Sequence, residues 1–71
     1  MEKNIMVENN IRVLVQEENN HKIFTIIDEK EVLIQEAAEG IFKGLVKPVQ
    51  ERFQMYSALP INDHTYKFVV Y

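Results

Sequence analysis

The two histidines, His21 and His64, are the side chains best suited to acid–base or metal chemistry near neutral pH. Neither has a second histidine at ligand spacing, and the chain contains no cysteine. Zinc sites need three or four ligands, preferably nitrogen or sulfur. We therefore expect no metal and no other cofactor. We interpret both histidines as solvent-exposed turn residues, although the order of the strands could still bring them together.

Ser57 is the only serine, and Asp63 and His64 follow it closely in the sequence. A catalytic triad made from such near neighbours would lack a nucleophile elbow and a glycine-rich oxyanion loop. Carboxylates are plentiful, but general acid–base catalysis needs them in a concave, partly desolvated site, which so small a chain rarely encloses. We predict that the chain is not an enzyme, that Ser57 ends a helix, and that the acidic groups are solvated.

The only glycines, Gly40 and Gly44, lie inside a helical pattern and not in a phosphate-binding turn between a strand and a helix. With Leu33 and Ala37 they form one flank of that helix. Such a flank favours close packing against a neighbouring helix or sheet, or alternatively a contact with a second chain.

A basic residue between aromatic residues, as in Tyr66-Lys67-Phe68, occurs on sheets that stack on nucleic-acid bases. However, Phe68 is more typical of a core residue, and the net charge of −3 is opposite to the basic balance of most nucleic-acid binders. The alternative function is therefore a nucleic-acid-binding regulator that uses four residues, Arg12, Lys22, Tyr66 and Lys67.

The composition of the chain limits the elements that can position these residues. With 71 residues, 46% of them hydrophobic and 27% charged, it fits one domain, 1–71, with a thin margin of stability. No signal peptide and no apolar stretch of about 20 residues is present, so we expect a cytoplasmic protein without a membrane partner. Abundant Lys, Asn and Ile indicate A/T-rich coding, which is typical of some bacteria and their phages.

The first 28 residues alternate apolar runs with two Glu-Asn-Asn segments, a pattern that predicts a three-stranded meander. Asn19 and Asn20 fit a two-residue type I′ turn, because asparagine tolerates positive φ. That turn places Val13 opposite Ile26 on a core face, together with Val15 and Phe24, and it places Glu17 opposite Lys22 at the rim. The opposite face then carries Arg12, Leu14, Gln16, Ile23, Thr25 and Ile27.

From Asp28, a good N-cap with Glu31 three residues later, the apolar period becomes helical. Its apolar residues are Ile34, Ala37, Ala38, Ile41, Phe42 and Leu45. We predict a helix to about residue 46 and a second helix over 48–58, with a single kinked helix as the alternative. Pro60 should end the helical region, 61–64 should form a loop, and 65–71 should form a strand. The expected fold is an α+β two-layer sandwich of order βββααβ, a mostly antiparallel sheet with helices on one face.

One helical layer shelters only one sheet face, which leaves apolar residues on the other. We therefore predict a small regulatory or inhibitory protein-binding module that acts through this face or through an edge strand, on a protein partner or on a second copy of itself. The interface residues would be Arg12, Leu14, Ile23, Thr25, Ile27, Val69 and Tyr71.

Overall fold

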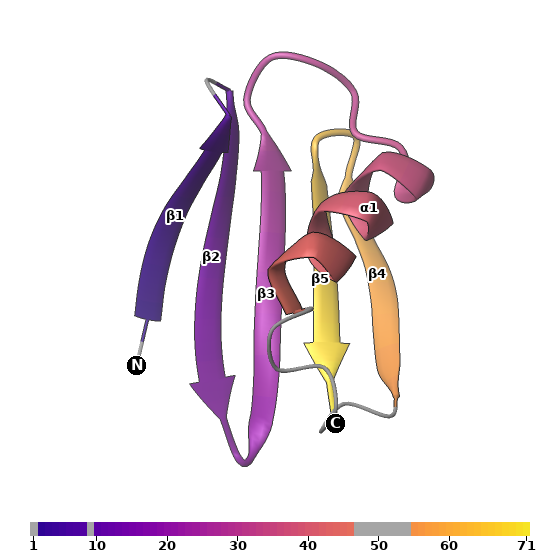
Figure 1. Ribbon diagram of the computed structural model, residues 1–71. Helices are drawn as coiled ribbons and strands as arrows, with labels where there is room; N and C mark the ends of the chain where they lie inside the picture. The colour runs from indigo at the N-terminus through magenta and orange to yellow at the C-terminus, as the bar shows by residue number, and fades with distance from the viewer. Residues whose placement is uncertain (1, 9, 47–54) are drawn as a thin grey trace.

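The computed structural model describes residues 2–8, 10–46 and 55–71. Five strands form one antiparallel sheet in the order β1-β2-β3-β5-β4. These strands are β1 (Glu2–Glu8), β2 (Ile11–Glu18), β3 (His21–Asp28), β4 (Tyr56–Asn62) and β5 (Thr65–Val70). One helix, α1 (Gln35–Val46), crosses one face of the sheet in front of β3, β5 and β4 (Figure 1). This side is the helix face, and the other side, on which no described segment lies, is the open face.

The chain is therefore mostly β, and the expected α+β sandwich of order βββααβ is wrong. Within the described residues there is a single short helix, packed against β3 and β5. Most of the second helix expected over 48–58 lies outside the described residues, and its last part, with Ser57, belongs to strand β4.

The three-stranded meander is confirmed, and so is its predicted register. Val13 pairs with Ile26, Val15 with Phe24, and Glu17 with Lys22. The turn residues Asn19 and Asn20 have φ values of 51° and 69°, in the left-handed region that a type I′ turn requires. Because side chains alternate between the two faces of a strand, this one turn determines which residues of β2 and β3 face α1.

Residues 56–62 form a strand where a helix and a loop were predicted. Strand β5 already pairs with β3 on one side, and β4 satisfies the backbone groups along its other edge. Tyr56 and Ala58 lie opposite the buried residues Val70 and Phe68, so their side chains belong to the helix face. Pro60 does not end a helix but lies within β4, at the edge of the sheet, where proline is tolerated.

Helix α1 begins at Gln35, seven residues after the predicted N-cap Asp28. The Asp28 carboxylate does accept the backbone N–H groups of Lys30 and Glu31, but these hydrogen bonds stabilise a loop. Within that loop Leu33 is buried and donates its backbone N–H to the carbonyl oxygen of Asp63. The chain therefore crosses the end of the sheet before it becomes helical, and Ile34 is exposed where an apolar helix position was predicted.

The core lies between α1 and the helix face of the sheet. Ala38 and Phe42 are buried, and Ile41 and Leu45 pack against them, as the helical pattern predicts. The buried strand residues are Val13, Phe24, Ile26, Phe68 and Val70. Gly40 and Gly44 are exposed, and no described atom outside the helix backbone would lie within 4 Å of a Cβ added at either one. Among the residues that the structure describes, the expected close packing on these glycines is therefore not found.

Candidate functional site

The predicted interface residues meet on the open face of the sheet. Its middle row runs across all five strands as Asn4, Leu14, Thr25, Lys67 and Leu59. The row toward the β2–β3 turn contains Gln16, Ile23, Val69 and Ser57, and the row toward Asp28 contains Met6, Arg12, Ile27 and Thr65. Each row thus contains both aliphatic and polar side chains.

Six of the seven predicted interface residues lie within these rows and are partly exposed: Arg12, Leu14, Ile23, Thr25, Ile27 and Val69. Tyr71 follows β5 at the margin of the same face, with 56% of its surface exposed. Met6 and Leu59, which are 58% and 44% exposed, also lie on this face but are not among the predicted interface residues. Leu59 was missed because its strand was read as a helix, although the alternation of Tyr56 and Ala58 with Ser57 and Leu59 contained the signal.

The end of the open face near the β2–β3 turn is aromatic and polar. The His21 ring meets the Tyr71 ring edge-on, with centroids 5.2 Å apart. The Tyr71 hydroxyl lies 3.1 Å from the Ser57 hydroxyl, at hydrogen-bonding distance. These contacts hold Tyr71 across the margin of the face.

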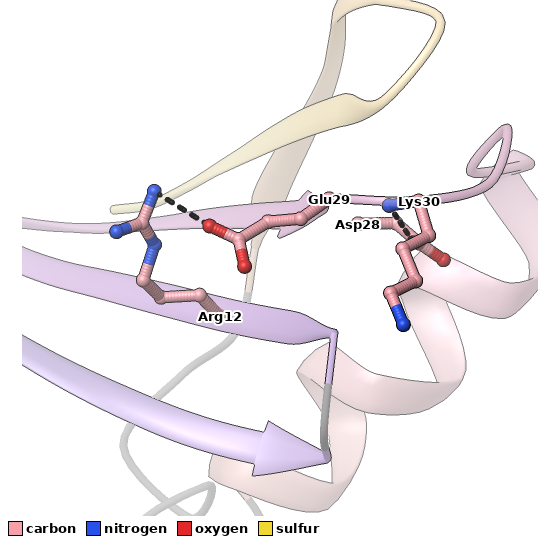
Figure 2. A network of polar contacts seen from close by, with 4 residues as sticks. All are labelled: Arg12, Asp28, Glu29 and Lys30. Carbon is pink, nitrogen blue, oxygen red and sulfur yellow. Dashed lines mark hydrogen bonds and ion pairs between the residues drawn. The ribbon is translucent and has the colours of Figure 1, made fainter.

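The other end of the open face carries an ion pair. The Arg12 guanidinium lies 3.2 Å from the Glu29 carboxylate, and both side chains are 44% exposed (Figure 2). The neighbouring Asp28 is 7% exposed and accepts hydrogen bonds from the Asn10 side-chain amide and from the backbone N–H groups of Lys30 and Glu31. The backbone hydrogen bonds lower the pKa of Asp28 below its ordinary value and outweigh the opposing effect of desolvation.

Hydrogen bonds around Asp28 also join three loops. The Asp28 backbone N–H donates to the carbonyl oxygen of His64, and the Glu29 N–H donates to that of Asn10. His64 places Nδ1 2.7 Å from the Glu31 carbonyl oxygen, so Nδ1 carries the hydrogen in this contact. This network fastens the segment before α1 to both neighbouring hairpin turns, which is a structural role.

None of the enzyme-like groupings considered in the sequence assembles. His21 begins β3 and His64 bonds to its last residue, so the two histidines lie at opposite ends of one strand. Ser57 pairs with Val69 and lies far along the hairpin from Asp63 and His64. Among residues 2–8, 10–46 and 55–71, no three His, Asp or Glu side chains are grouped so that they could hold a metal ion.

The four residues of the nucleic-acid alternative do not share a surface. Arg12 and Lys67 lie on the open face, whereas Lys22 and Tyr66 pair with Val70 and Ile26 on the helix face. Tyr66 also packs against the core beside Phe68. A single nucleic acid lying on either face would therefore meet only part of this set.

The free edges of the sheet differ in how well they can accept another strand. The hydrogen bond from the Tyr71 N–H to the Met55 carbonyl oxygen shows that Met55 faces β5. Because backbone groups alternate in direction, those of Tyr56, Ala58 and Pro60 face outward from β4. Pro60 has no N–H, so the β4 edge is interrupted. The Asp28 N–H points toward β5, and the same alternation can be followed from there through β3 and β2 to β1. The backbone groups of Asn4 and Met6 therefore point away from β2, along the free edge of β1.

Searches of protein-family models, curated proteins and solved structures return no match. In the part of the chain that the structure describes, no helix is both long and apolar enough to cross a membrane.

Proposed function

We propose that this chain is a small, non-enzymatic protein-binding module that docks through the open face of its sheet. One observation carries the proposal: aliphatic side chains are partly exposed in every row of this face, and no described segment covers them. They are Met6, Leu14, Ile23, Ile27, Leu59 and Val69.

The open face has the composition expected of a docking surface. Aliphatic side chains lie in all three rows, around Thr25 and Lys67 in the middle row, and the Arg12–Glu29 ion pair and the His21–Tyr71 contact lie at the two ends of the face. Protein interfaces commonly combine apolar side chains with polar ones and have a polar rim. A partner covering this face would remove from water the apolar area that the chain alone leaves partly exposed.

The test compares two double variants. Leu14→Glu with Ile27→Glu places charges on the open face, whereas Val32→Glu with Ile34→Glu places the same charges on exposed apolar residues of the loop before α1. We expect the wild-type chain and the loop variant to retain the same co-purifying protein, and the open-face variant to lose it. Binding measured with that protein in purified form then gives the loss in affinity. Retention by both variants would contradict the proposal.

Circular dichroism and urea denaturation show whether the open-face variant folds. If it does not, Thr25→Glu provides the same test, because it replaces a polar, partly exposed residue of the same face. Sedimentation equilibrium at increasing concentrations of the wild-type chain decides whether the protein partner is a second copy. A dimer that the open-face change dissociates would identify the copy as the occupant.

A further inference from the structure

Lys67 is the cation of the open face that has no acid beside it. Its cross-strand neighbours are Thr25 and Leu59, and its neighbours two residues along β5 are Thr65 and Val69. The diagonal positions on β3 and β4 carry Ile23, Ile27, Ser57 and, opposite Thr65, Asn62, and all of these neighbours are uncharged. Lys67 makes no ion pair with any residue in the described ranges, and its side chain is only partly exposed.

The other charges of the open face are placed differently. Arg12, the second cation, is already paired with Glu29. Glu18, the remaining acid among the described side chains of this face, is exposed beside the β2–β3 turn, on the far side of the Gln16–Ile23–Val69 row from Lys67. A partner that covered the middle row would therefore desolvate the Lys67 ammonium without any compensating acid from this chain. Burying an unpaired charge in this way is costly.

A second copy of the chain does not supply what Lys67 lacks. The described acids of its open face lie at the two ends, at Glu18 and Glu29, and not among the aliphatic residues. Face-to-face packing of two copies is thus disfavoured by charge.

We propose that the occupant of the open face is an amphipathic helix of a partner protein, with one carboxylate in its apolar stripe that pairs with Lys67. This inference rests on the proposed function and specifies the partner. A helix is the element that commonly covers a sheet face, as α1 does on the other side of this sheet (Figure 1). Its aliphatic side chains would lie on Leu14, Ile23 and Val69, and its carboxylate would neutralise the one cation that the chain leaves unpaired on this face.

The experiment uses synthetic 18-residue amphipathic helical peptides that differ at one central position of the apolar stripe, which is Glu, Gln or Lys. Binding to the full chain is measured by fluorescence anisotropy, and the contact surface is mapped by backbone amide shifts. We expect the Glu peptide to bind about tenfold more tightly than the Lys peptide, with shifts centred on Leu14, Ile23 and Val69. Lys67→Glu should reverse that order, and Lys67→Gln should abolish the preference.

Lys43→Glu is the matched control, because it makes the same charge change at an exposed residue of α1. It should leave the preference for the Glu peptide intact. If Lys43→Glu and Lys67→Glu changed the preference for the Glu peptide equally, the preference would depend only on the overall charge of the chain. That result would overturn the inference. If the peptides bind the open face but the substitutions at residue 67 do not change the order of the Glu, Gln and Lys peptides, the carboxylate pairing is overturned and the docking function stays in place. Peptides that bind elsewhere, or not at all, would overturn the helical occupant, while the double variants above would still decide the docking function.

Discussion

The ring of Phe42 lies parallel to the ring of Phe68, with centroids 4.5 Å apart and an angle of 6° between the planes. Phe24 meets Phe42 edge-on at 5.4 Å, and Tyr56 lies tilted at 4.8 Å. One helical side chain thus contacts aromatic residues of β3, β5 and β4. Phe42 therefore links α1, the only helix among the described residues, to three strands of the sheet.

Removing this ring should cost much of the stability of the fold. Phe42→Ala removes a side chain that is only 2% exposed, and such changes destabilise by about 3–5 kcal/mol. A chain of 71 residues has a total stability of only about 4–10 kcal/mol. We expect the variant to unfold at a much lower urea concentration than the wild type, as followed by circular dichroism. Phe42→Leu, which keeps most of the apolar volume, should lose clearly less, and equal losses would contradict the prediction.

The sequence predicts the three-stranded meander correctly because the residues that determine it lie close together in the chain. Two adjacent asparagines select a tight turn, the turn sets the register, and alternation then assigns both faces of β2 and β3. The same residues therefore predicted which side chains α1 would cover and which would stay on the open face. This hairpin alone was enough to place four residues on the open face: Leu14, Ile23, Thr25 and Ile27.

Residues 56–62 could not be assigned in this way, because their strand depends on a distant partner. The apolar residues Tyr56 and Leu59 have helical spacing, while Tyr56 and Ala58 alternate with Ser57 and Leu59. Both periods fit seven residues, and Pro60 is compatible with a helix end or with an edge strand. Pairing with β5 decides between them. The isolation of Lys67 was hidden for the same reason, since Leu59 is one of its two cross-strand neighbours.

The turn between β2 and β3 gives a second prediction. Asn20 has a φ of 69°, a conformation that costs most other residues about 1–2 kcal/mol. Asn20→Ala should therefore destabilise the chain by about 1 kcal/mol in urea denaturation, whereas Asn20→Gly should cause no loss, because glycine adopts this φ without strain. A glycine variant as unstable as the alanine variant would show that the asparagine side chain matters for another reason.

The exposed helical glycine gives a prediction of opposite sign. Gly40 has open space where a Cβ would lie, and alanine is favoured over glycine inside a helix by about 1 kcal/mol. We expect Gly40→Ala to raise the free energy of unfolding by about that amount. The matched control is Ala37→Gly on the same helix, also exposed, which should lower stability by a similar amount. A destabilising Gly40→Ala change would reveal a close contact at this position.

Asp28 should make the stability of the fold depend on pH in the acid range. The N–H groups of Glu31 and Lys30 hold the pKa of this carboxyl below its ordinary value. A carboxyl whose pKa is lower in the folded state stabilises that state at neutral pH, and this contribution is lost as the pH falls below about 4 toward the folded-state pKa. Asp28→Asn cannot gain or lose the charge. We therefore expect it to be less stable than the wild type at neutral pH and to approach the wild type in acid, as measured by urea denaturation across that range. Asp63→Asn, the same change at an exposed residue of the neighbouring turn, is the control. A stability difference between wild type and Asp28→Asn that stayed constant with pH would contradict this role for the carboxylate.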